Sequence, residues 1–296
     1  MKKVIVSIFC TVLISNMLSA QIVVSSDNTT KKNEVQEAQD LGQATIRTYY
    51  HFTQKSKKED KIAFRNDTMT LDVGPQVSYY YDETKSKKDS LFNHAITNLN
   101  PNTIKSISVY KGNNPLEFDN LAGDKYEMNY YDGTTEKIFK NRVNGEITII
   151  DHSSDAYMCV DPVASFGWKI MDETAVVLDY TCQKATAHFR GRDYEAWFSS
   201  EIPVNDGPWK FFGLPGMILR VNDTEGLIAF ECIGLQFLDE PYTIAIPVKK
   251  YIKCSWKELQ KVMKNRGGGT GLAIDGGNVT LVNKELSPSF TPLELK

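Results

Sequence analysis

The sequence predicts a mainly β protein with a minor helical part: a single strongly curved antiparallel sheet or an open half β-barrel, with two short helices packed on it. Three observations predict this class. From Ala44 onward, short segments rich in Tyr, Phe, Ile, Val and Thr are separated by turn residues about every 8 to 12 positions, which is typical of antiparallel strands. Several of these segments flank Asn-Gly, Asp-Gly or Glu-Gly pairs, whose glycine favours tight turns. Only two stretches show apolar residues at helical spacing.

The composition is that of an ordinary globular protein. The 296 residues include 34 Lys and Arg against 37 Asp and Glu, which gives a formal net charge of −3. These values exclude collagen-like, wholly disordered and strongly basic nucleic-acid-binding proteins. We therefore expect no nucleic-acid partner.

Residues 1–20 have the features of a secretory signal peptide. Lys2 and Lys3 precede an apolar run, and Ser19-Ala20 provides small residues at the expected cleavage site. A membrane anchor is the weaker alternative, because the run falls short of the roughly 20 apolar residues that a span needs. We expect the mature protein to lie in the periplasm, at the outer membrane or outside the cell, with no transmembrane anchor.

Residues 21–42 are expected to be a disordered leader. The stretch is rich in Ser, Asp, Asn, Thr, Lys and Glu and has no aromatic residue, so it cannot bury enough surface to offset the entropy of ordering. The remaining residues, 43–296, are expected to form one β-rich domain.

Three hairpins are expected at the glycine-containing turns 132–133, 144–145 and 225–226. The strand pairs are 126–131 with 134–139, 137–143 with 146–150, and 217–221 with 227–233. Because each pair joins neighbours in the chain, the core of the sheet is expected to be a meander. Lysine-rich pieces at 55–61 and 85–88 are expected to be solvated hairpin loops.

Two helices are expected. The first covers about 89–99, where Asp89-Ser90 can cap the start and Asn100-Pro101 ends the pattern. The second covers about 255–265, with apolar residues at helical spacing after Ser255.

A loop with large apolar side chains stands between Gly207-Pro208 and Pro215-Gly216. Exposure of four such side chains would cost several kcal/mol at ~25 cal/mol per Å², so the loop must fold inward or meet a partner. We interpret it as a plug packed into the open side of a curved sheet. The alternative is that the aromatic residues line a pocket for an apolar ligand. The candidate residues for such a pocket are Trp168, Trp197, Trp209, Phe211, Phe212 and Leu214.

Residues 213–218 read Gly-Leu-Pro-Gly-Met-Ile. In this motif the chain resembles the GLPGLI family of exported proteins from Bacteroidota, also called the Porphyromonas-type family, with Met217 in place of Leu. The resemblance extends to residues 46–52, 207–211 and 230–234 and to the ending at 292–295. It implies an exported β-rich domain over 43–296. It implies no established activity, so there are no catalytic positions to carry over.

Four cysteines remain once the signal peptide is removed. In an oxidising compartment an even number of cysteines suggests disulfides. We favour Cys182 with Cys232, which leaves Cys159 with Cys254; free buried thiols are the alternative. The histidines are far apart in sequence and form no metal-binding motif, so we expect no metal and no cofactor.

Sequence motifs for catalysis are absent. There is no G-x-S-x-G elbow, and the acidic pairs 172–173, 223 with 225, and 239–240 lie in turn-like surroundings. The glycine-rich run 267–271 follows a helix and lacks the ending of a phosphate loop. His188, Arg190 and Arg192 are candidates for an anion site on one face of a hairpin, and a solvated hairpin tip is the alternative.

These observations favour an exported, non-catalytic binding or envelope-assembly accessory protein. Its partner would be an envelope protein, a peptide or an apolar ligand. A hydrolase that uses acidic residues is one alternative. Another is a structural domain that pairs with an outer-membrane partner through an exposed edge strand.

Overall fold

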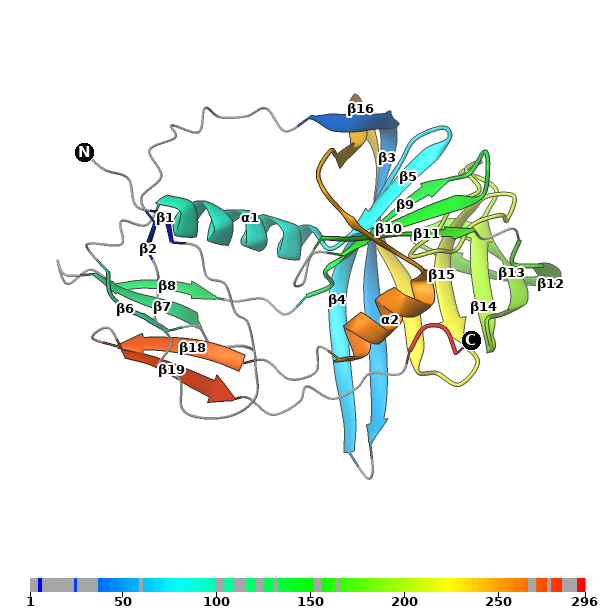
Figure 1. The fold of residues 1–296 in the computed structure, drawn as a ribbon. Helices are drawn as coiled ribbons and strands as arrows, with labels where there is room; N and C mark the ends of the chain where they lie inside the picture. The colour runs from blue at the N-terminus through cyan, green and yellow to red at the C-terminus, as the bar shows by residue number, and fades with distance from the viewer. Residues whose placement is uncertain are drawn as a thin grey trace. The chain divides into compact units, whose positions relative to one another are not determined.

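The computed structural model of the protein (Figure 1) describes residues 5–6, 24–25, 37–58, 61–98, 104–108, 115–120, 125–129, 133–151, 156–162, 165–265, 270–275, 278–283 and 292–295. The chain forms two compact units, a smaller one of residues 1–36, 88–132 and 269–285 and a larger one of residues 37–87, 133–268 and 286–296. The predicted signal peptide lies outside the described residues except for β1 (Ile5–Val6), which pairs with β2 (Val24–Ser25).

The larger unit is built on one 12-stranded sheet. Its spatial order is β12-β13-β14-β15-β16-β3-β4-β5-β9-β10-β11-β17, and all neighbours are antiparallel except β11 and β17. The strands are β3 (Ala38–Lys58), β4 (Lys61–Val73), β5 (Val77–Tyr81), β9 (Glu136–Asn141), β10 (Glu146–Asp151), β11 (Tyr157–Pro162), β12 (Lys169–Val177), β13 (Tyr180–Phe189), β14 (Arg192–Ser199), β15 (Met217–Asp223), β16 (Ile228–Pro247) and β17 (Ile252–Cys254).

The predicted fold class is confirmed: the protein is mostly β, with one large antiparallel sheet and two helices. The sheet is open, with β12 and β17 as its two edges. It is also strongly curved, since it brings the β13–β14 turn close to β11, near the opposite edge. Arg190 in that turn forms an ion pair with Asp161 on β11. The predicted leader is too long, since β3 begins at Ala38 and pairs with β16 there.

The smaller unit holds a second sheet, of five strands in the order β19-β18-β6-β7-β8, that the sequence did not reveal. Its strands are β6 (Ile104–Ser108), β7 (Pro115–Asn120), β8 (Lys125–Asn129), β18 (Thr270–Asp275) and β19 (Asn278–Asn283). The expected hairpin at turn 132–133 is therefore wrong: β8 pairs with β7, whereas β9 pairs with β5 and β10. Burial of Ile138 and Phe139 against distant strands outweighs the local turn signal.

The other expected hairpins are confirmed. A turn at residues 142–145 joins β9 to β10, with Gly145 at φ 69°, and the turn containing Gly226 joins β15 to β16. The lysine-rich segment 55–61 also forms a hairpin, but β3 and β4 extend to a pairing of Lys58 with Lys61.

Helix α1 (Glu83–Asn98) begins earlier than expected. Asp82 caps it: the Asp82 side-chain carboxylate accepts a 2.8 Å hydrogen bond from the backbone N–H of Lys85. The backbone carbonyl of Asp82 accepts a 3.0 Å hydrogen bond from the backbone N–H of Ser86. Residues 85–88 are therefore helical, which corrects the prediction of a loop.

Helix α2 (Trp256–Asn265) lies where it was predicted. Its start is a capping box: the Ser255 N–H donates to Glu258 Oε2 at 2.8 Å, and the Glu258 N–H donates to Ser255 Oγ at 3.3 Å. Neither α1 nor α2 has the length and apolar character of a helix that could cross a membrane.

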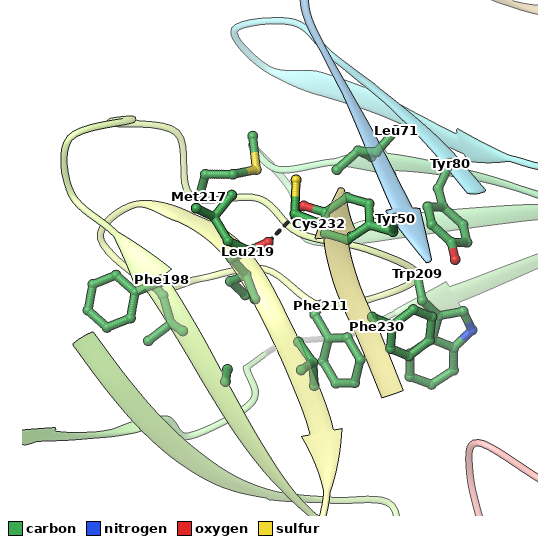
Figure 2. Close-up of a cluster of buried hydrophobic side chains, with 14 of the residues drawn as sticks. Tyr50, Leu71, Tyr80, Phe198, Trp209, Phe211, Met217, Leu219, Phe230 and Cys232 are labelled. Atoms are coloured by element: carbon green, nitrogen blue, oxygen red, sulfur yellow. Dashed lines mark hydrogen bonds between the residues drawn. The ribbon is translucent and has the colours of Figure 1, made fainter. Parts of the chain in front are cut away.

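The core of the larger unit draws side chains from strands far apart in sequence. Figure 2 shows Tyr50, Leu71, Phe211 and Phe230 in one cluster of buried side chains. The Tyr50 hydroxyl is buried and donates a 2.7 Å hydrogen bond to the carbonyl of Ile218. The loop that forms the candidate site packs against this core.

Candidate functional site

The loop of residues 200–216 joins β14 to β15 and packs inward, as the sequence predicts. Trp209, Phe211 and Leu214 are at most 2% exposed, and the ring of Phe211 lies 4.9 Å from that of Tyr194. The end of the loop passes so close to β14 that a Cβ at Gly216 would stand 2.1 Å from a backbone oxygen. The loop is therefore part of the core.

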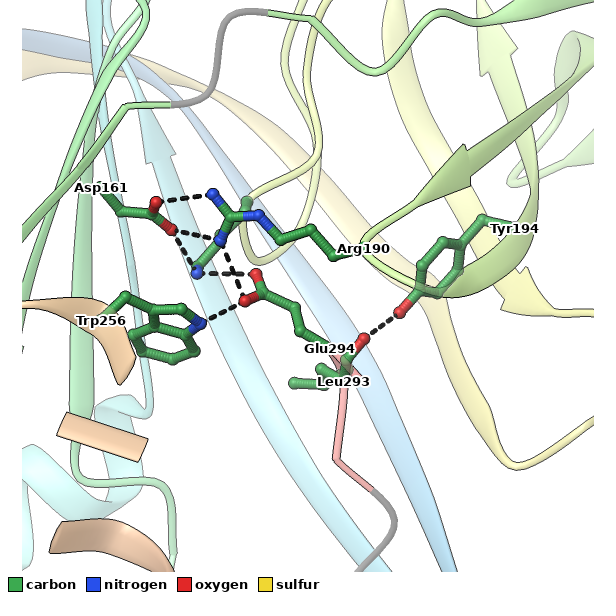
Figure 3. A network of polar contacts seen from close by, with 7 residues as sticks. Asp161, Arg190, Tyr194, Trp256, Leu293 and Glu294 are labelled. Carbon is green, nitrogen blue, oxygen red and sulfur yellow. Dashed lines mark hydrogen bonds and ion pairs between the residues drawn. The ribbon is translucent and has the colours of Figure 1, made fainter. Parts of the chain in front are cut away.

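An ion cluster anchors the middle of this loop, and Figure 3 shows four of its members, Asp161, Arg190, Trp256 and Glu294, converging from separate elements. We call it the Lys210 cluster: Lys210, Asp161, Glu294, Arg190 and Trp256. The Lys210 ammonium lies 2.7 Å from Asp161 Oδ2 and 2.7 Å from Glu294 Oε1. Arg190 binds Asp161 through two hydrogen bonds of 2.7 and 2.8 Å and Glu294 through one of 3.0 Å. Two cations and two carboxylates thus balance in a cluster in which Lys210 and Glu294 are fully buried and Arg190 is 24% exposed.

Asp161 makes the stability of the protein depend on pH. Burial, the largest effect, raises the pKa of its carboxyl, but the hydrogen bonds and charges of Arg190 and Lys210 outweigh it and lower the pKa below its usual value. The group therefore stabilises the fold above the unfolded pKa of about 3.9, and this stabilisation is lost as the pH falls through the folded value.

We expect the urea midpoint to decrease as the pH is lowered from about 5 to about 3, and to decrease less steeply in Asp161→Asn. Asp193→Asn is the control, because Asp193 is two-thirds exposed and should leave the pH profile as it is. Equal slopes in wild type and Asp161→Asn would contradict this role for Asp161.

A second buried ion cluster, the Asp206 cluster, holds the start of the loop. The Asp206 carboxylate contacts the ammonium of Lys140 and the guanidinium of Arg142, and all three side chains are at most 5% exposed. Desolvation lowers the pKa of Lys140, against the effect of the neighbouring Asp206 charge. The Lys140 ammonium also donates to the carbonyls of Gly207 and Phe211, so β9 is tied to the loop.

An open groove of about 300 Å³ lies beside the outer part of the loop. Phe212 and Trp168 are half-buried in its wall, and the Trp168 indole N–H donates a 2.9 Å hydrogen bond to the Phe212 carbonyl. Ile170, the second residue of β12, is 49% exposed at its rim. The lining is Ser165, Phe166, Gly167, Trp168, Ile170, Phe212, Gly213, Leu214 and Pro215.

A second hollow, of about 410 Å³, lies on the other side of Pro215, which borders both. It is lined by Pro75, Arg142, Pro203, Val204, Asn205, Pro215 and Gly216. The exposed Pro215 therefore stands between the groove and the second hollow.

The six pocket candidates divide between core and groove. Trp209 and Phe211 are buried in the core and line neither hollow. Trp168, Phe212 and Leu214 line the apolar groove. Trp197 packs against the core from the partly exposed side and lies under the ammonium of Lys184, 5.9 Å from the ring centre.

The three anion-site candidates do not share one face, which corrects that prediction. The two-residue turn at 190–191 reverses the chain, so His188 shares a face with Asp193, and Arg192 with Phe189. Each of the three side chains also contacts a carboxylate of the chain itself. The pairs are His188 with Asp193, Arg190 with Asp161 and Glu294, and Arg192 with Asp223 and Glu225.

The four cysteines all lie among the described residues, and their thiols are free in the structure. Cys159 and Cys254 are register partners on β11 and β17, while Cys182 and Cys232 belong to one core cluster. Burial raises the pKa of the Cys232 thiol to about 12, so it is protonated at neutral pH. The two disulfides stay predictions.

The acidic pairs considered for hydrolysis do not face each other across a cleft. Asp223 is buried and accepts hydrogen bonds from the N–H groups of Leu227 and Ile228, whereas Glu225 is 65% exposed. The pairs 172–173 and 239–240 are exposed. In the described part of the chain, no group of three or more His, Cys, Asp and Glu side chains could hold a metal ion.

The sequence did not single out the two ion clusters. A signal was present, because Lys210 stands among large apolar residues in a loop expected to be buried, and a buried charge requires a partner. The partners Asp161, Glu294, Lys140 and Arg142 carry no local signal, since each reaches the loop from a distant element.

Comparison with known proteins identifies the same region of the chain. Residues 190–220 match the model of a family described as a protein of unknown function (Porph_ging). No curated protein matches the sequence.

Two solved structures of PNGF-II are similar to this chain at 14% sequence identity. Their TM-scores are 0.49 and 0.44, and they cover 77% and 75% of this chain. The match takes in 34% of each PNGF-II chain, so this chain spans about a third of the length of PNGF-II.

Proposed function

We propose that this protein is an exported, non-catalytic binding protein of the cell envelope that holds an extended polypeptide segment of a partner. One observation carries the proposal: the groove beside the loop, which is lined mainly by apolar and aromatic residues, continues into β12, an edge strand with exposed apolar side chains. Ile170, Met171 and Val176 are 49%, 41% and 67% exposed. Apolar side chains exposed next to a groove of this size are typical of a surface that meets a partner.

The edge of β12 provides backbone groups for recognition. β12 pairs with β13 on one side, and no described strand pairs with its outer side. An extended segment can add there as a further strand, with main-chain hydrogen bonds for affinity and an apolar side chain in the groove for specificity. A β-bulge between Ile170 and Thr174 interrupts the edge, so the geometry suits a short segment.

Export and family membership belong to the same proposal. The basic and apolar start of the sequence supports export through a signal peptide. The motif at 213–218 supports membership of the GLPGLI family, and the family-model match at 190–220 covers this motif. Of the motif residues, Gly213, Leu214 and Pro215 line the groove.

The contacts of the described carboxylates support binding over hydrolysis. The buried carboxylates of Asp161, Asp206 and Glu294 are each bound by cations. The exposed acidic pairs are solvated at the surface. None of these carboxylates lines either of the two hollows, whereas cleavage of a glycosidic bond needs a pair of carboxylates on either side of it.

The test is a binding titration with a fluorescent decapeptide that alternates apolar and polar residues and has Phe at its central apolar position. We expect saturable binding to the wild type and at least tenfold weaker binding to Ile170→Asp, since burying an apolar side chain contributes about 1.5 to 3 kcal/mol. Val143→Asp is the matched control, because Val143 is 70% exposed in a turn away from the groove residues.

Val143→Asp should bind like the wild type. A wild type that does not saturate, or an Ile170→Asp variant that binds as tightly as the wild type, would refute the proposed site.

A further inference from the structure

The Lys210 cluster has the geometry of a site for covalent modification. We infer that Lys210 and Glu294 become joined by an intramolecular amide between Nζ of the lysine and Cδ of the glutamate. The two groups are already 2.7 Å apart, and both side chains are fully buried. Reactive groups held in contact from the outset avoid most of the entropic cost of meeting.

A second carboxylate supplies the base. Asp161 Oδ2 also lies 2.7 Å from Lys210 Nζ, and the Asp161 side chain is 5% exposed. Arg190 binds Asp161 through both of its oxygens and keeps it ionised. Asp161 therefore accepts and passes on protons, while the carboxyl of Glu294 acylates the Lys210 amine.

The other oxygen of Glu294 lies among hydrogen-bond donors. Oε2 accepts hydrogen bonds from the indole N–H of Trp256 and, at 3.0 Å, from Arg190. These donors polarise the carboxyl and stabilise the negative charge that develops on this oxygen when the amine attacks. Figure 3 shows both donors aimed at this carboxylate.

Two indole rings lie next to the Lys210 amine and help to hold it against Glu294. The Lys210 ammonium lies 3.5 Å from the centre of the Trp256 ring and 5.1 Å from that of Trp209, and the side chain has no contact with solvent.

The step balances without an oxidant or another reactant. One proton of the ammonium passes to Glu294 Oε1, and the neutral amine attacks Cδ to form the N–C bond. A second proton passes through Asp161 Oδ2 to the same Oε1, the C–Oε1 bond breaks, and one water molecule leaves. An ammonium and a carboxylate become an amide and water.

The bond would fix the end of the chain to the loop that fills the core. Residues 292–295 already lie against the β13–β14 hairpin through three hydrogen bonds. The Leu295 N–H donates to the Arg190 carbonyl at 2.9 Å, the Tyr194 hydroxyl donates to the Leu293 carbonyl at 2.5 Å, and Arg192 Nε donates to the Pro292 carbonyl at 2.9 Å. A covalent closure restricts the unfolded chain, as a disulfide does.

The test is the intact mass of the folded, purified full-length or signal-processed protein, measured after denaturation. We expect the wild type to be lighter than its sequence mass by one water molecule, and Lys210→Arg to have its full sequence mass. Trypsin should release the peptide 193–220, uncut at Lys210, joined to the peptide 285–296. Asp161→Asn, checked for folding by circular dichroism, should slow the loss of water.

Lys184→Arg is the matched control. Lys184 also lies between two carboxylates, 3.3 Å from Glu173 and 3.1 Å from Glu195, but at the surface, so its replacement should leave the missing water unchanged. A cooperatively folded wild type at full sequence mass would overturn the inference. So would a loss of water that persists in Lys210→Arg.

Discussion

Replacement of Asp206 with Ala is expected to lower the free energy of unfolding by about 3 to 5 kcal/mol, because it leaves buried cations without their counterion. Asp206 is fully buried, and Lys140 and Arg142 are 1% and 5% exposed. The carboxylate also accepts a 2.7 Å hydrogen bond from the N–H of Gly207, so the variant additionally frees the start of the loop. Urea unfolding monitored by tryptophan fluorescence measures the difference.

The control for this prediction is Asp193→Ala. Asp193 also binds a potential cation, His188, at 2.7 Å, but both side chains are more than 60% exposed. Exposed pairs contribute little, so the change should be within about 0.5 kcal/mol. Similar losses for the two variants would show that burial of the Asp206 cluster does not determine its effect.

The periodicity of the sequence was sufficient to predict the sheet and helix α2. Short segments rich in β-branched and aromatic residues between turn residues predicted the strands, and apolar residues at helical spacing after Ser255 predicted the helix. Both signals are local: they depend on residues within one element.

The wrong predictions concern parts of the fold that are determined by contacts between residues outside the local pattern. The turn at 132–133 was predicted to join a hairpin. Instead β9 pairs with β5, whose residues lie more than 50 positions earlier in the chain than their partners on β9. The lysines at 85–88 suggested a loop because the cap, Asp82, lies outside the apolar pattern of α1. The second sheet joins segments near residues 104–129 and 270–283, and no local pattern could bring them together.

The candidate site was predicted in part. The sequence located the aromatic loop and three of the nine residues that line the groove, because the Gly-Pro and Pro-Gly pairs and the large apolar side chains are local features. It could not distinguish Trp209, in the core, from Trp168, at the groove, since both are indoles in apolar stretches. It also treated Arg190 and Arg192 as free for an external anion, because their carboxylate partners come from other elements.

Replacement of Trp209 with Ala is expected to lower the free energy of unfolding by about 3 to 5 kcal/mol, the cost of a cavity in a packed core. Trp209 is 2% exposed, and its ring packs edge-on against Phe211 at 5.2 Å. Its backbone has φ 50°, a strained value for a residue with a side chain, which persists because the surrounding contacts hold it.

Phe237→Ala separates this effect from the loss of any aromatic ring. Phe237 is 64% exposed on β16, so its replacement should change the free energy of unfolding by less than about 0.5 kcal/mol. A Trp209→Ala variant with the unfolding midpoint of the wild type would mean that the loop does not fill the core. The groove beside Phe212 would then lack the rigid wall on which the proposed binding depends, because that wall is the outer side of the same loop.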